Sequence, residues 1–126
     1  MGEVTTLYRP VGPRELELIE RSAWREFPPR LADQPIFYPV LARQYAEQIA
    51  RDWNSKSDTG GRAGYVTRFS VETAFLARYE PKQVGGASHL EYWVPAEDLP
   101  EFNRQIVGPI EVVTAYHDGD ETFSRE

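Results

Sequence analysis

Apolar residues recur at spacings of three and four in two parts of the chain, which is the pattern of a helix with one buried face. The pattern is clearest over residues 41–53, where positions 45, 46, 49, 50 and 53 are apolar, and it recurs over residues 13–24. Pro13 suits the first position of the earlier helix, because its missing N–H would have no helical partner there. We therefore predict two amphipathic helices in the first half of the chain.

Shorter segments complete the predicted set of elements. Residues 71–79 predict a short helix capped by Ser70, and residues 96–103 predict a second one. Runs of β-branched and aromatic residues predict strands. These runs are residues 4–8, 36–40, 65–70, 92–94 and 109–116.

The mixed order of these elements indicates an α+β fold, with three or four short helices on a strongly curved, partly antiparallel sheet. We assign residues 1–116 to a single domain. Residues 54–64 are polar and rich in glycine, and they predict a loop. Residues 117–126 are polar and acidic, and we expect a frayed tail in which His117 is solvated.

The composition and charge of the chain argue against several classes of function. The chain has 126 residues, 20 Asp and Glu against 14 Lys and Arg, and a net charge of −6, which argues against general binding of nucleic acid or anionic membrane. It has no cysteine and two histidines, so thiol chemistry is excluded and a metal site is not expected. No stretch predicts a membrane span or a signal peptide, so we expect a cytoplasmic protein, although a protein delivered to another cell could share these features.

Residues 87–95 carry the most suggestive chemistry. They follow the Gly85-Gly86 pair, which predicts a tight turn, and they end at Pro95. Glu91 directly precedes two large aromatic residues there. Its carboxylate is either partly desolvated and aimed into a cleft, or solvated on the outer face of an edge strand.

Two further side chains have open interpretations. Arg9 ends the first strand, where its planar fork of donors either faces a cleft and suits phosphate or carboxylate, or forms an ordinary surface ion pair. Tyr38 precedes the helix of residues 41–53 and either stacks on a flat ligand or, like Tyr45, is a core or rim aromatic.

Three motifs taken together resemble the small bacterial members of the ADP-ribosyltransferase-like superfamily. Leu7-Tyr8-Arg9 resembles the strand end that contacts NAD, and Phe37-Tyr38 before a helix resembles the middle of such domains. The run His89-Leu90-Glu91-Tyr92-Trp93-Val94-Pro95 is similar to the motif that carries the catalytic glutamate. The resemblance covers about residues 7–113, although each motif is short.

The resemblance implies a curved, mostly antiparallel split sheet and an enzyme that uses NAD as substrate. Arg9 would bind the NAD pyrophosphate or ribose, and Tyr38 would stack near nicotinamide, with Tyr45 and His89 beside them. Glu91 would stabilise positive charge on the ribose as the nicotinamide bond breaks. The second substrate would be an acceptor of unknown identity, a protein being one option.

The chain also departs from the family pattern. His89 stands where the transferases have Gln or Glu, which leaves the acceptor open. The Ser-Thr-Ser strand motif is not evident, and its nearest substitutes are Thr67 and Ser70, or Tyr38 in an alternative scheme. A non-catalytic relative therefore stays open.

A second hypothesis is a small non-catalytic interaction protein, such as an immunity protein or antitoxin. Its acidic charge would suit a basic partner, and Trp24, Trp53 or Trp93 would supply binding hot spots. The two hypotheses differ in one structural respect. A transferase must place Arg9, Tyr38 and Glu91 around one cleft, whereas an interaction module would show an exposed aromatic patch.

Overall fold

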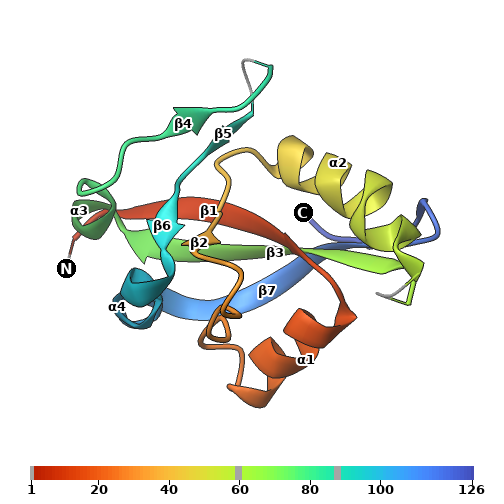
Figure 1. The fold of residues 1–126 in the computed structure, drawn as a ribbon, viewed down its shortest axis with the longest axis horizontal. Helices are drawn as coiled ribbons and strands as arrows, with labels where there is room; N and C mark the ends of the chain where they lie inside the picture. Colours follow the sequence, from red (N-terminus) through yellow and green to blue (C-terminus); the bar gives the residue numbers. More distant parts are fainter. Residues whose placement is uncertain (1, 59–60, 87–88) are drawn as a thin grey trace.

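The computed structural model describes residues 2–58, 61–86 and 89–126, and within them the chain has the predicted α+β fold with a mostly antiparallel sheet (Figure 1). The four helices are α1 (Pro13–Arg21), α2 (Arg43–Asp52), α3 (Thr73–Leu76) and α4 (Leu99–Arg104). Single 3-10 turns, η1 (Asn54–Lys56) and η3 (Ala96–Asp98), follow α2 and precede α4. The strands are β1 (Val4–Val11), β2 (Ile36–Phe37), β3 (Ala63–Glu72), β4 (Lys82–Gln83), β5 (Leu90–Glu91), β6 (Val94–Pro95), β7 (Ile106–His117) and β8 (Asp120–Ser124).

Four long strands form the main sheet, in the order β1-β3-β7-β8, and every neighbouring pair is antiparallel. Strand β3 lies between β1 and β7, and the ladder with β7 carries two register shifts. Such irregularities bend a strand and increase its twist. Strands β2 and β6 form a separate pair, as do β4 and β5.

The core has two parts. The larger cluster contains Phe27, Phe37, Phe69 and Phe102, which are at most 2% exposed and contact one another edge to face or at a tilt. The smaller cluster lies beneath α2, where Ala46 and Ala50 pack against the sheet. Helices α1 and α2 lie on opposite sides of the long strands in Figure 1, so each covers a different part of the core.

Several predicted boundaries are wrong, for reasons that lie outside the local pattern. Helix α1 ends at Arg21 rather than near Trp24, because Ala23 and Trp24 adopt positive φ angles. Of the strand predicted at residues 92–94, only Val94 is in a strand, β6, and residues 92 and 93 connect β5 to β6, where the chain changes its pairing partner from β4 to β2. The two residues at the start of the central stretch, 87 and 88, lie outside the described residues.

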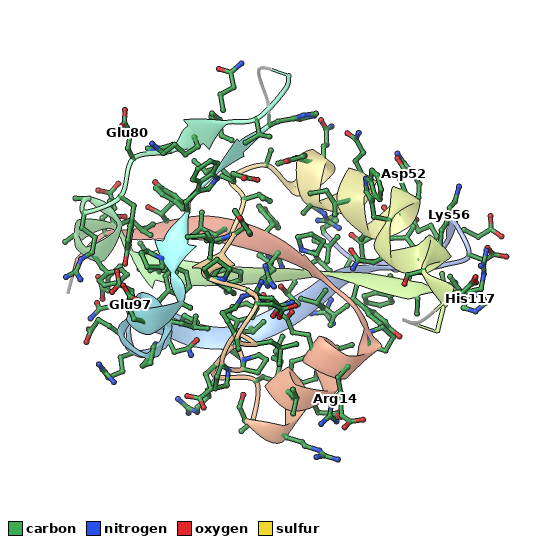
Figure 2. The ribbon with its side chains drawn as sticks, viewed as in Figure 1. Arg14, Asp52, Lys56, Glu80, Glu97 and His117 are labelled. Atoms are coloured by element: carbon green, nitrogen blue, oxygen red, sulfur yellow. The ribbon has the colours of Figure 1, made fainter. Side chains whose placement is uncertain are left out.

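The predicted cap and tail are also wrong. Ser70 lies within β3, which continues to Glu72, and Glu72 occupies the cap position of α3. Residues 120–124 are not frayed, because they pair with β7 as strand β8. His117 is exposed at the end of β7, as predicted, and projects from the edge of the molecule in Figure 2.

The loop predicted over residues 54–64 is only partly irregular. It begins with the 3-10 turn η1, and its last two residues belong to β3. Residues 59 and 60 lie outside the described part. Among the described residues, no helix combines the length and apolar character needed to cross a membrane, and no three acidic or histidine side chains gather as a metal-binding group.

Candidate functional site

A short extended segment, residues 39–41, brings the two distant parts of the candidate site together. Val40 exchanges backbone hydrogen bonds with Tyr8 of β1, at 2.9 and 2.8 Å. On its other side the segment forms backbone hydrogen bonds with Leu90 of β5 and with Tyr92. The Leu41 N–H donates to the Leu90 carbonyl at 3.0 Å, and the Tyr92 N–H donates to the Pro39 carbonyl at 2.9 Å. Arg9, next to Tyr8, and Glu91, next to Leu90, therefore flank the same segment.

A pocket of about 440 Å³ opens at this junction. Arg9, Tyr38 and Glu91 all line it, and the remaining wall is largely apolar. The other lining residues are Pro10, Val40, Ile49, Asn54, Val84 and Trp93. An apolar pocket of this size with a few convergent polar groups is typical of a small-molecule site.

Glu91 is the only carboxylate among the lining residues, and it is 8% exposed. Each of its oxygens accepts one hydrogen bond from an aromatic donor. The indole Nε1 of Trp93 donates to Oε1 at 2.7 Å, and the hydroxyl of Tyr45 donates to Oε2 at 3.3 Å. Because an ionised carboxylate has about four acceptor positions, both oxygens can still accept a hydroxyl from a ligand.

Tyr45 and His89 form a second layer behind the carboxylate. Their rings stack at a centroid distance of 4.3 Å and an interplanar angle of 9°. Burial and the neighbouring Glu91 carboxylate both raise the pKa of the Tyr45 hydroxyl, which therefore stays a donor to Glu91. His89 Nδ1 accepts a hydrogen bond from Gly86 N–H at 3.3 Å, so the glycine turn helps to orient the stacked ring.

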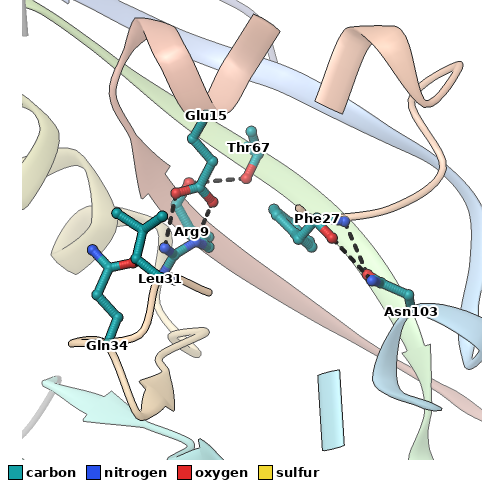
Figure 3. A network of polar contacts seen from close by, with 7 residues as sticks. All are labelled: Arg9, Glu15, Phe27, Leu31, Gln34, Thr67 and Asn103. Carbon is teal, nitrogen blue, oxygen red and sulfur yellow. Dashed lines mark hydrogen bonds and ion pairs between the residues drawn. The ribbon is translucent and has the colours of Figure 1, made fainter. Parts of the chain in front are cut away.

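Arg9 is also 8% exposed, and its guanidinium is held by Glu15 (Figure 3). Nε and Nη2 donate to the two oxygens of Glu15 at 2.7 and 3.0 Å. The guanidinium lies 4.6 Å from the ring centroid of Phe37, and Thr67 donates to the Arg9 backbone carbonyl at 2.9 Å. Arg9 is thus fixed in both backbone and side chain.

Sequence reasoning missed two members of this arrangement. Glu15, in the first turn of α1, forms the paired contact with Arg9. Trp93 was considered only as an exposed hot spot, but its indole also orients Glu91. The spacing of Glu91 and Trp93 carried a usable signal, because residues two apart on an extended chain point to the same face.

The aromatic residues at the mouth of the pocket are exposed. Tyr38 is 40% exposed and Trp93 is 45% exposed, and their rings meet edge to face at 6.2 Å. Of the three tryptophans considered as hot spots, Trp24 is partly buried against the larger core, and Trp53 is 73% exposed at the end of α2.

Comparisons of the chain with protein-family models, with curated proteins and with solved structures found no match. The assignment of a function therefore depends on the geometry and chemistry of the pocket.

Proposed function

We propose that the chain is an ADP-ribosyltransferase-like protein that binds NAD in this pocket and cleaves its nicotinamide–ribose bond. The observation that carries the proposal is the convergence of Arg9, Tyr38 and Glu91 on one pocket. These residues are 29 and 53 positions apart along the chain, and each was selected from the sequence as a contact to the same dinucleotide. A common pocket is the arrangement that such a reaction needs.

The chemistry assigned to Glu91 follows from its environment. Cleavage of the glycosidic bond develops positive charge on the ribose, and a carboxylate fixed in a poorly solvated site stabilises that charge. Trp93 and Tyr45 hold the carboxylate in place, so it need not reorganise as the charge develops. A ribose hydroxyl would donate to one of the remaining acceptor positions of Glu91.

The other end of the pocket supplies the positive charge that a diphosphate needs. Arg9 lines the pocket, and its guanidinium would bind the diphosphate while Glu15 fixes the guanidinium plane. The exposed rings of Tyr38 and Trp93 at the mouth give flat surfaces on which the nicotinamide ring can pack. The acceptor would be water or an acceptor molecule that approaches from this open side.

Nicotinamide release and NAD binding test the proposal together. Glu91→Gln keeps the shape of the side chain and one of its two acceptor atoms but removes the charge. We expect it to lower the rate of nicotinamide release by about a hundredfold or more, because electrostatic stabilisation of the transition state is lost. Calorimetric affinity for NAD should change far less, since the ground-state contacts largely remain.

A matched control is Glu97→Gln, which removes an exposed carboxylate on η3, at the periphery of Figure 2. It should leave both release and binding as in the wild type. The proposal fails if millimolar NAD does not bind the wild-type protein, or if Glu91→Gln releases nicotinamide at the wild-type rate.

The second candidate function is a non-catalytic interaction module. The observation in its favour is the group of exposed residues at the pocket mouth, where Val84 is 40% exposed beside Tyr38 and Trp93. Under this hypothesis the pocket receives a side chain of a partner protein. Replacement of Trp93 by Ala would then abolish complex formation, whereas Glu91→Gln would have a smaller effect.

A further inference from the structure

Arg30 differs from the other arginines that are not fully exposed. In the described part of the chain these arginines are residues 9, 30, 43, 62 and 68. Four of them form an ion pair with a carboxylate, and Arg30 forms none. Its Nε is buried and has no hydrogen-bond partner. A guanidinium without a partner in a poorly solvated place costs free energy, because its lost hydration is not replaced.

The surroundings of Arg30 increase this cost. Arg30 and Glu15 line one cavity of about 330 Å³, together with Arg14, between the start of α1 and the 28–34 loop. Glu15 gives both its oxygens to Arg9, and Arg14 pairs with Glu17 instead. Burial lowers the pKa of Arg30, and the positive charge of Arg9 lowers it further. The guanidinium groups of Arg9 and Arg30 thus both interact with the carboxylate of Glu15.

The pair between Arg9 and Glu15 also connects this cavity to the candidate site. Arg9 lines the pocket that contains Glu91, while Glu15 lines the cavity that contains Arg30. Arg30 therefore shares a cavity with the carboxylate that binds Arg9. A ligand that extends from the pocket past Arg9 would reach the cavity of Arg30.

We propose that Arg30 and Arg9 together form a subsite for a diphosphate, with Arg30 as its unrecognised half. This assignment rests on the proposed function, because it identifies the anion as the diphosphate of the dinucleotide whose ribose meets Glu91. A diphosphate supplies the negative charge and the acceptor oxygens that Arg30 lacks in the ligand-free protein. The role of Arg30 is then to bind the ligand and not to stabilise the fold.

Calorimetry with three probes on three proteins tests the subsite. The probes are inorganic pyrophosphate, ADP-ribose and nicotinamide, and the proteins are the wild type, Arg30→Gln and Arg25→Gln. Arg25 is the matched control, because it is an exposed arginine five positions away that lines none of the pockets described above. We expect Arg30→Gln to weaken pyrophosphate and ADP-ribose by about tenfold or more, as the loss of a charged hydrogen bond implies. Nicotinamide binding, and every affinity of Arg25→Gln, should match the wild type.

The outcomes separate this inference from the proposed function. If nicotinamide is released by the wild type but Arg30→Gln binds ADP-ribose as the wild type does, the subsite is wrong while the proposed function stands. If NAD does not bind but pyrophosphate binds in a manner that depends on Arg30, the anion subsite stands and the NAD reaction is wrong. Failure of the wild type to bind either pyrophosphate or ADP-ribose overturns the subsite.

Thermal unfolding without ligand gives an independent test. Removing an uncompensated charge should leave the melting temperature of Arg30→Gln equal to or above that of the wild type. A clear decrease would show that Arg30 supports the fold and would contradict its assignment to a ligand. Arg9→Gln should show the opposite behaviour, because it leaves the carboxylate of Glu15 without its partner.

Discussion

At the scale of single residues, aromatic side chains donate hydrogen bonds to two acidic groups of this protein, Glu91 and Asp98. Trp93 and Tyr45 each donate a hydrogen bond to the buried Glu91. The same chemistry recurs between α3 and η3, where the Tyr79 hydroxyl, just after α3, donates to Asp98 of η3 at 2.9 Å. In each case a polar tip satisfies a carboxylate while the ring contributes apolar surface.

Tyr79 gives a prediction at this scale. Burial and the hydrogen bond to Asp98 raise the pKa of Tyr79 from 10.0 to about 12. The folded protein therefore holds this proton more tightly than the unfolded chain does. The corresponding stability is present below pH 10 and is lost as the pH rises to about 12. Urea unfolding across this window should show a steeper loss of stability for the wild type than for Tyr79→Phe.

Other tyrosines with raised pKa values also contribute to the loss of stability at alkaline pH. Burial raises the pKa of Tyr45, Tyr92 and Tyr116, so part of the alkaline loss should persist in Tyr79→Phe. Parallel loss of stability in the two proteins would contradict the role given to Tyr79. Replacing Asp98 with Asn should lower the pKa of Tyr79, because the amide accepts the hydrogen bond without a negative charge.

At the scale of elements, close contact between α2 and β3 supports one wall of the pocket. Gly64 of β3 is buried directly beneath the end of α2 and the start of η1. A Cβ at this position would collide with the Ala50 carbonyl oxygen and lie 2.8 Å from Cβ of Asn54. Asn54 and Ile49, which line the pocket, belong to the elements that such a collision would displace.

Gly64→Ala is therefore predicted to destabilise the protein by about 1–3 kcal/mol, as overpacking of a close contact does. The matched control is Gly12→Ala, because nothing lies within 4 Å of a Cβ there and the φ angle of −88° suits any residue. Gly12 is the N-cap of α1, where alanine is less favourable than glycine, so we expect the control to lose at most about 1 kcal/mol. Equal free energies of unfolding for the two variants, measured in urea, would show that α2 adjusts freely.

At the scale of the whole molecule, rigidity is unevenly distributed. The β1-β3-β7 sheet carries both core clusters, and β3 has a partner on each side. The pair β4–β5 has only two residue pairs, and β4 is exposed. Figure 1 shows this pair extending away from the long strands. Glu91 of β5 and Val84, which directly follows β4, line the pocket.

Hydrogen exchange should reproduce this distribution. We expect the amides of β4 and β5 to exchange much faster than those at the centre of β3, since few buried contacts oppose their opening. A ligand in the pocket should slow exchange in β4 and β5 and leave β3 unchanged. The exchange is measured by mass spectrometry. Equal exchange rates in the β4–β5 pair and in the centre of β3, in the ligand-free protein, would contradict this description.

The sequence by itself determined the type and order of most elements. Helical spacing over residues 41–53 and alternation over residues 65–70 are local patterns, and each produced an element within a few residues of its predicted place. The α+β class followed from their mixed order. Pro13 and the Gly85-Gly86 pair likewise act locally, through a fixed φ angle and a permitted positive one, so the helix start and the turn were predictable.

The tertiary structure alone decided which residues meet. Pairing of β8 with β7 and placement of residues 39–41 between β1 and β5 depend on backbone hydrogen bonds, which every residue but proline can donate. The ion pair between Glu15 and Arg9 was not predictable either, because the sequence around a carboxylate on an amphipathic helix does not show which cation it will pair with. Arg9, Tyr38 and Glu91 could be predicted as candidate site residues from their chemistry and from the family resemblance, but their common pocket arises from contacts between distant segments.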